Sequence, residues 1–342
     1  VDIGARGTAT IGGMIATNAG GIRVLRYGMM RAQVLGIEAV LFDGTILSDM
    51  RGLDKNNAGL NLTQLFVGSE GTLGVVTRAK LRLHPAPDFS TTALCAVPGI
   101  ESALELLVAL RKRLGGALTA FEGIWPQVYS GAVGLAGNSP LPIGAGLYLL
   151  VEMHGFAGVT QPDALEQALM DAVEAGLIAD VVVAQSGREE TALWRLREFC
   201  TDYTFSLGQL QPHDVSLPLR NLPEFVRRAD ALVSHLDRDA LVMIYGHLGD
   251  GNLHYLVKTQ HRAGVAAAVN QLAADLGGSI TAEHGIGLDK RDYLPLVAGP
   301  AEIGAARRII QALNPYGTLN PGRMLPQDKA APMRGQSLRP KD

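Results

Sequence analysis

The sequence predicts an α+β protein whose glycine-rich first part precedes a larger part built on an antiparallel sheet. Three observations support this class. Glycine is dense in residues 1–87, Pro85-Ala-Pro87 interrupts the chain, and strand-like and helix-like segments then follow in the order β-α-β-β-α-β. That order is typical of a ferredoxin-like antiparallel sheet with its helices on one face. We therefore expect domains at residues 1–87 and 88–326, and a disordered polar tail at 327–342.

Composition limits the kind of partner and compartment. The chain has 342 residues, of which 47% are hydrophobic and 18% charged, and its formal net charge is -3. This near-neutral balance, without a cluster of Lys and Arg, argues against nucleic acid or an anionic membrane as the main partner. Cys95 and Cys200 are too few for a disulfide framework. A reducing, cytoplasmic location is therefore expected, free in solution or peripheral to the inner membrane.

The first domain offers short glycine-rich segments to a phosphate-bearing ligand. Residues 9–21 read Ala-Thr-Ile-Gly-Gly-Met-Ile-Ala-Thr-Asn-Ala-Gly-Gly, and residues 65–77 place further glycines between two apolar runs. Without a Cβ, such backbone can approach a dinucleotide or flavin closely. Neither a Rossmann nor a P-loop motif is present, and a glycine-rich domain built only for packing is the alternative. Strands at 34–42 and 45–47, joined by Asp43-Gly44, predict a hairpin.

The second domain alternates strands and helices, and no internal repeat is visible in it. Residues 122–152 carry no charge between their two terminal acids. Because Pro140, Pro142 and several glycines break a helix there, we expect a loop and a buried strand, and no integral membrane segment. The expected strands lie at 91–97, 118–124, 146–153, 178–184 and 214–217, and the expected helices at 101–114, 163–175, 186–206, 223–236, 263–276 and 301–313.

Two histidines flank a predicted hairpin tip in the second domain. The apolar runs 241–245 and 253–257 enter and leave the glycine-rich turn at 249–252. A four-residue loop would set His247 directly opposite His254, with Cβ atoms ~4.5 to 5.5 Å apart, which suits two ligands of one divalent ion. The alternative is a pair of hydrogen-bonded histidines at a hairpin end.

An adjacent acid and histidine follow a second short strand. Residues 277–287 run into a glycine turn that carries Glu283 and His284. In an extended segment these neighbours point to opposite sides, so one can complete a His2Glu metal site while the other faces a reactant. Three protein ligands with an open position are typical of a catalytic site. A surface Glu beside a capping His is the alternative.

Five motifs occur in one order along residues 1–325. They are Thr10-Ile-Gly-Gly with Asn18-Ala-Gly-Gly, Gly68-Ser-Glu-Gly-Thr-Leu-Gly, Gly246-His-Leu-Gly-Asp-Gly-Asn-Leu-His, Ala282-Glu-His-Gly-Ile-Gly and Asn320-Pro-Gly-Arg. Together they resemble the FAD-linked D-2-hydroxy-acid dehydrogenases of the vanillyl-alcohol-oxidase type, such as D-lactate dehydrogenases, the glycolate oxidase flavin subunit and D-2-hydroxyglutarate dehydrogenases. The resemblance implies a partial FAD-binding domain and a substrate (cap) domain whose C-terminal segment returns to the flavin.

The resemblance also implies the role of individual residues. His284 is the catalytic base, Arg197 and Thr201 contact the substrate carboxylate, and His247, His254 and Glu283 hold a divalent metal, commonly zinc. The implied FAD-binding residues are Ile11, Gly12, Gly13, Asn18, Gly20, Gly21, Glu70, Gly71, Gly74, Val76 and Asn320. The expected reaction oxidises a D-2-hydroxy acid to the 2-oxo acid, with hydride passing to the flavin.

The sequence departs from this family in three ways. The family has roughly a hundred or more further residues before Val1, including the loop that cradles the FAD pyrophosphate, so this chain alone is expected to hold FAD poorly. Pro212 and Leu256 stand where hydroxyglutarate enzymes have Lys and Asn. The acid is thus left open among lactate, glycolate and hydroxyglutarate, and the electron acceptor among an electron-transfer flavoprotein, a quinone and a cytochrome. A homodimer is compatible, and a metal-dependent hydrolase or an inactive flavin-free module are alternatives.

Overall fold

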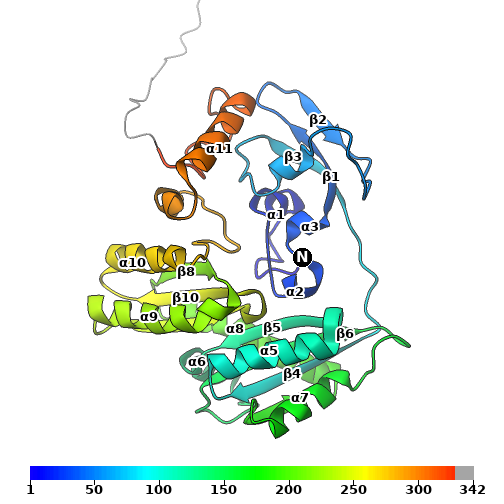
Figure 1. The fold of residues 1–342 in the computed structure, drawn as a ribbon, viewed down its shortest axis with the longest axis vertical. Coiled ribbons are helices and arrows are strands. Elements are labelled where there is room, and N and C mark those ends of the chain that lie inside the picture. Colours follow the sequence, from blue (N-terminus) through cyan, green and yellow to red (C-terminus); the bar gives the residue numbers. More distant parts are fainter. Residues whose placement is uncertain (328–342) are drawn as a thin grey trace, which may run out of the picture.

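A computed structural model of the protein describes residues 1–327, so all but one residue of the predicted tail lies outside the described part. Its strands form two antiparallel sheets (Figure 1). The smaller sheet has the order β2-β1-β3 and consists of β1 (Val34–Val40), β2 (Ile46–Asp49) and β3 (Val75–Leu81). The predicted hairpin is confirmed, because β1 pairs with β2 around Gly44, whose φ is 83°. The class prediction of mixed helices and antiparallel sheet is also confirmed.

Four short helices accompany the smaller sheet. Apolar side chains such as Ile15, Met30, Ile37 and Phe66 are fully or almost fully buried in its core. The helices are α1 (Ile11–Thr17), α2 (Val24–Tyr27), α3 (Met30–Gln33) and α4 (Thr63–Phe66). Helix α2 contacts the larger sheet at β5, and the first segment of the chain therefore lies between the two sheets (Figure 1).

The larger sheet has seven strands in the order β7-β4-β6-β5-β9-β10-β8. The first half consists of β4 to β7. If these strands are numbered 1 to 4 along the chain, their order in the sheet is 4-1-3-2, which is the ferredoxin-like arrangement. The bounds are β4 (Phe89–Val97), β5 (Leu118–Ile124), β6 (Leu147–Gly155), β7 (Asp180–Val183), β8 (Gln211–Ser216), β9 (Leu241–Gly246) and β10 (Asn252–Lys258).

The second half of the sheet repeats this topology, although the sequence shows no repeat. The order β8, α9, β9, β10, α10 matches β4, α5, β5, β6, α7, except that a further helix, α6, lies between β5 and β6. The strands lie as β8-β10-β9 beside β4-β6-β5. Ser279 and Thr281 bridge to the free side of β8, where β7 would lie in the first half. The halves join through β5 and β9, with Gly123 paired to Gly246.

Helices cover the larger sheet unequally. Side chains of α5, α7, α9 and α10 share one continuous core with one face, while those of α6 and α8 pack on the other face. The bounds are α5 (Ile100–Leu114), α6 (Pro126–Ala136), α7 (Ala164–Glu174), α8 (Gly187–Ser206), α9 (Leu222–Leu236) and α10 (Arg262–Asp275). None of the helices in residues 1–327 is long and apolar enough to cross a membrane.

Helix α6 corrects the prediction of a loop before β6. Pro126 occupies the first turn, where a missing N–H costs nothing, and Gly137 ends the helix with φ 73°. Pro140 lies beyond that end and so does not interrupt the helix. Helix α11 (Pro300–Leu313) then carries the chain back to the smaller sheet, where the Asn314 amide donates to the Thr72 carbonyl at 3.2 Å.

Candidate active site

The histidine hairpin differs in register from the prediction. His254 pairs with Tyr245 on β9 and with Asp214 on β8, while His247 lies just beyond the end of β9. A 3-10 turn, η3 (Leu248–Asp250), takes up the residues that were expected to form a simple loop. The two imidazoles nevertheless meet, with ring centroids 5.4 Å apart in a T-shaped arrangement.

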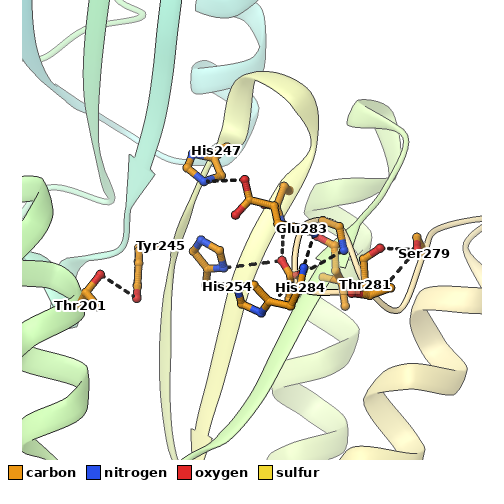
Figure 2. A network of polar contacts seen from close by, with 12 residues as sticks. Thr201, Tyr245, His247, His254, Ser279, Thr281, Glu283 and His284 are labelled. Atoms are coloured by element: carbon orange, nitrogen blue, oxygen red, sulfur yellow. Dashed lines mark hydrogen bonds and ion pairs between the residues drawn. The ribbon is translucent and has the colours of Figure 1, made fainter. Parts of the chain in front are cut away.

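Glu283 completes the predicted triad of metal-ligating groups. One ligand atom from each of His247, His254 and Glu283 lies within 4.8 Å of the others. Glu283 Oε1 is 3.4 Å from His247 Nε2. Figure 2 marks this contact with a dashed line. Two imidazole nitrogens and one carboxylate oxygen are a donor set that zinc accepts.

The Glu283–His284 segment is a bend and not the extended strand that was predicted. The backbone N–H groups of Ala282, Glu283 and His284 all donate to Asp214 Oδ2, at 3.1, 2.9 and 3.1 Å. The two side chains still face different groups, since Glu283 reaches His247 and the His284 side chain is 61% exposed. Three consecutive donors converging on one oxygen account for the bend.

A second set, Asp214, His254 and His284, also lies within metal-ligating distance. Both Asp214 oxygens, however, already accept hydrogen bonds, Oδ2 from three backbone N–H groups and Oδ1 from Asn252 at 2.9 Å. A metal there would displace these donors. Among the described residues, Glu283 has only its contact with His247 to give up. The residues therefore fit a metal better in the His247, His254 and Glu283 set.

Glu122, on β5, supports the site from the first half of the sheet, and it escaped the sequence analysis. It is 1% exposed and accepts from His247 Nδ1 at 2.8 Å and from Arg197 Nε at 2.9 Å. A single acid inside the apolar run 118–124 was the signal that could have found it. Because Glu122 occupies Nδ1, the Nε2 atom of His247 is left for a metal, as in many metal sites where a carboxylate orients the ligand.

Charge and burial set the protonation of the two histidines apart. Burial raises the pKa of Glu122, but His247 and Arg197 outweigh this effect and hold that pKa below its usual range. Glu122 in turn raises the pKa of His247 well above its usual value, against the effect of burial. Burial and the neighbouring His247 lower the pKa of His254 to about 3, which keeps its imidazole neutral and able to act as a ligand.

The two predicted substrate contacts lie on one helix, α8, beside Tyr245. The Arg197 guanidinium stacks over the Tyr245 ring at 4.7 Å, and the Thr201 hydroxyl is 3.3 Å from the Tyr245 hydroxyl (Figure 2). Within residues 1–327, the hydrogen bond to Glu122 uses only Nε of Arg197. Both terminal nitrogens therefore remain for an anion, in the planar arrangement that suits a carboxylate.

Comparison with known proteins places the chain in a family. Residues 86–324 match the family model described as FAD linked oxidases, C-terminal domain, and residues 1–49 match the FAD binding domain. The chain belongs to the FAD-linked oxidases. It is similar to the mitochondrial D-2-hydroxyglutarate dehydrogenase of Bos taurus, with 37% identity over 332 residues that cover 95% of this chain and 60% of the relative.

A bacterial relative and two solved structures agree with this placement. D-2-hydroxyglutarate dehydrogenase of Stutzerimonas stutzeri (strain A1501) is 36% identical over 95% of this chain and 71% of that protein. The structure of p-cresol methylhydroxylase matches with a TM-score of 0.65, 15% identity, and coverage of 92% of this chain and 68% of that chain. The structure of a 4-ethylphenol oxidase from Gulosibacter chungangensis matches with a TM-score of 0.64 and 15% identity. This match covers 93% of this chain and 70% of that chain. The predicted vanillyl-alcohol-oxidase type of fold is confirmed.

These comparisons also set two limits on this FAD-linked oxidase. The chain spans about 60% of the length of the mitochondrial relatives from Bos taurus and rice. The prediction of a cytoplasmic location is contradicted, because relatives from cattle, rice, Arabidopsis thaliana and Danio rerio are named mitochondrial enzymes. Low cysteine content indicates a reducing compartment but does not distinguish the cytoplasm from the mitochondrial matrix.

The predicted flavin-binding residues of this oxidase gather around α1. Ile11 is 47% exposed, and a Cβ on Gly12 would lie 3.3 Å from the Val76 carbonyl. Asn18 ends the helix with φ 50° and accepts from the Arg31 N–H at 2.9 Å. A Cβ on Gly20 would lie 2.8 Å from Glu283 Oε1, so this segment touches the candidate metal site directly.

The remaining predicted flavin residues join three of the sequence motifs. Glu70, with φ 51°, accepts from the N–H groups of Ile286 and Gly287 at 2.7 and 2.9 Å, and the Asn320 amide donates to the Glu70 carbonyl. Gly71 lies within van der Waals range of Asn320. At Gly21 and Gly74 an added Cβ would collide with backbone carbonyls of Asp2 and Val40. Packing alone thus requires glycine at these two positions.

Proposed function

We propose that this FAD-linked oxidase oxidises a D-2-hydroxy acid to the corresponding 2-oxo acid, with FAD and a divalent metal as cofactors. One observation supports this most directly. A His2Glu donor set, an exposed imidazole at His284 and an arginine with free terminal nitrogens lie together beside the glycine segment at Gly20. A hydroxyl, its proton and a carboxylate are the groups that these side chains bind.

The proposed roles follow from the contacts of each residue. His247, His254 and Glu283 would hold the metal, for which zinc suits the donors. When bound, the metal supplies a Lewis acid for the substrate hydroxyl and FAD supplies the acceptor of hydride from C2. His284 takes the hydroxyl proton, and Arg197 binds the carboxylate while Glu122 fixes its guanidinium.

The relatives support the substrate class. The proteins from Bos taurus, Rattus norvegicus and Stutzerimonas stutzeri are named D-2-hydroxyglutarate dehydrogenases. Carried to this chain, the name supports a D-2-hydroxy acid as the substrate. The subsequent electron acceptor stays a prediction from the sequence resemblance: an electron-transfer flavoprotein, a quinone or a cytochrome. The hydrolase alternative has no support from these relatives.

Turnover of enantiomeric acids tests this function. The natural protein, loaded with flavin and zinc, is mixed with D-lactate, glycolate or D-2-hydroxyglutarate and an artificial dye acceptor. We expect reduction of the dye by at least one of these acids, and none by L-lactate or L-2-hydroxyglutarate. Flavin-replete protein that reduces the dye with none of them, or only with L-enantiomers, would show the proposal to be wrong.

A further inference from the structure

We propose that Asp214 is a positioning residue that builds the Glu283–His284 bend and orients the imidazoles of His254 and His284. Asp214 lies on β8, is 2% exposed, and lies directly beside His254 in the sheet. The part of this proposal that concerns His284 as a base rests on the proposed function. The part that concerns metal binding does not.

The first step concerns the bend itself. Asp214 Oδ2 receives the N–H groups of residues 282, 283 and 284, which lie 68 to 70 positions away in the chain. Oδ1 receives the Asn252 amide at 2.9 Å. These four donors compensate a buried carboxylate. In its absence the N–H groups of Glu283 and His284 would lose their acceptor together, while the Ala282 N–H would keep the Asp214 backbone carbonyl at 3.1 Å. The backbone that carries Glu283 would then lose its present course.

The second step concerns the two imidazoles. His254 Nδ1 is 3.7 Å from Oδ1, and His284 Nδ1 is 3.6 Å from Oδ2. The rings are nearly parallel, 6° apart in orientation and 6.0 Å between centroids (Figure 2). A carboxylate that faces Nδ1 of both rings favours a proton on that nitrogen in each. The Nε2 lone pair is left for a metal on His254 and for a substrate proton on His284.

The third step concerns what Asp214 holds in common. It contacts the side chain of one ligand, the backbone of a second ligand and both the backbone and side chain of the base. Within residues 1–327, the side chains that donate to Glu122 are those of His247 and Arg197, and Glu122 lies in the other half of the sheet. The spacing between the proposed metal ligands and the proposed base would therefore be set from β8, while Glu122 connects the proposed ligand His247 to Arg197.

The test compares Asp214→Asn with Glu122→Gln as a matched control, since each exchanges one buried carboxylate for an amide of the same shape. Metal affinity is measured by chelator competition, Co²⁺ absorption reports ligand geometry, and hydrogen exchange reports residues 279–287. We expect D214N to lower metal affinity about 10- to 100-fold, alter the Co²⁺ spectrum and expose the amides of Glu283 and His284. E122Q should weaken the metal similarly and leave those amides protected.

Kinetics complete the test on flavin-loaded protein. D214N with saturating metal should reduce its flavin at least about 10²-fold more slowly at saturating substrate, with KM changed by less than about threefold, because the base is misplaced and Arg197 is not. If D214N does not fold, Asn252→Ala, which removes one donor from Oδ1, should still alter the Co²⁺ spectrum.

The outcomes separate the two proposals. Protected amides and an unchanged Co²⁺ spectrum in D214N, or an unchanged spectrum in N252A where D214N does not fold, would overturn the role of Asp214. The metal and exchange measurements need neither flavin nor substrate. Their success in a protein that oxidises no D-2-hydroxy acid would therefore leave the Asp214 role standing and remove only the proposed function.

Discussion

The two halves of the seven-stranded sheet have the same topology but contribute different kinds of residue to the candidate site. In the half made of β4 to β7, helices pack on both faces, and β5 and most of β6 are buried along their length. In the half made of β8 to β10, α9 and α10 cover one face. On the other face Asp214, Tyr245 and His254 form a row across the three strands. Helices α6 and α8 cover this face in part, at Met243, Tyr245 and Leu256. The row of polar side chains on it is thus what distinguishes the candidate site from the packing unit.

The half of the sheet made of β4 to β7 is not inert. Its acids Glu122 and Glu152 lie on the same face of the sheet as His254, and each holds groups from elsewhere. Glu122 binds His247 and Arg197, while Glu152 accepts from Arg23 at 2.8 Å and from Trp194 at 2.9 Å. We infer that the half made of β4 to β7 supplies two buried acids that orient groups from elsewhere, while the half made of β8 to β10 carries His254 together with an orienting acid of its own, Asp214.

The largest effect is expected from removal of a proposed metal ligand in the half of the sheet made of β8 to β10. His254→Ala should lose the metal and abolish turnover, because two remaining ligands do not hold zinc in competition with water. Flavin content should not change, since the predicted flavin residues lie around α1. Elemental analysis and flavin absorbance of the same sample measure both. Active wild-type protein without any divalent metal would remove this site from the mechanism.

His284→Ala should be next in size and should differ in kind. Loss of a positioned base typically slows reaction ~10²- to 10⁴-fold, about 3 to 5 kcal/mol. The metal should stay bound, because His284 is outside the preferred ligand set. Rapid-reaction measurement of flavin reduction tests this, and an unchanged rate in metal-replete H284A would exclude His284 as the base.

Glu152→Gln should lower the stability of the fold and leave the rate of the reaction unchanged, if the half of the sheet made of β4 to β7 only orients other groups. Removing one partner of a fully buried ion pair costs ~3 to 5 kcal/mol. Arg23 is 25% exposed and keeps its ion pair with Asp2, so the loss in E152Q should be smaller than that range. Denaturant unfolding gives the free energy. Glu174→Gln, an exposed acid at the end of α7, is the control. A variant that is as stable as the wild type but turns over poorly would show that Glu152 contributes to the reaction itself.

How far the sequence could predict this arrangement depends on the range of each contact. The Asp43-Gly44 hairpin and the strand order were predictable, because turn residues and short connections decide them locally. The hairpin register was wrong, because a 3-10 turn at Leu248–Asp250 consumes residues that a strand pattern cannot assign. Asp214 and Glu122 were missed because their partners lie 70 and 125 positions away in the chain.

A buried histidine on β8, on the face that α9 and α10 cover, predicts how the stability of the protein depends on pH. His213, next to Asp214 on β8, points to the core and contacts the Tyr255 ring. Burial lowers the pKa of His213 to about 4, despite its hydrogen bond with Asn270. The neutral form is thus favoured on folding, so this stability is complete above the ordinary pKa of ~6.5 and declines as pH falls toward 4.

His213→Leu should flatten that part of the stability curve. The wild type should lose on the order of 3 kcal/mol of unfolding free energy between pH 6.5 and 4 from this group alone. The variant lacks this contribution to the slope whatever its absolute stability. Chemical unfolding at a series of pH values measures both slopes, and equal slopes would show that His213 does not titrate on unfolding.

The smallest effect concerns α8. This helix packs on the half of the sheet made of β4 to β7, yet it carries Arg197 and Thr201 to Tyr245 on β9. Ser186 begins this helix by accepting from the Glu189 N–H at 3.4 Å. Ser186→Ala should lower the free energy of unfolding by about 1 kcal/mol through loss of the cap. Ser206→Ala, at the exposed last turn, should change it by less than about 0.5 kcal/mol. KM should be unchanged in both, because the hydrogen bond that Arg197 donates to Glu122 and the stacking on the Tyr245 ring hold Arg197 eleven residues from the cap. A raised KM in S186A alone would mean that the half made of β4 to β7 places the substrate arginine through the whole helix and not through Glu122.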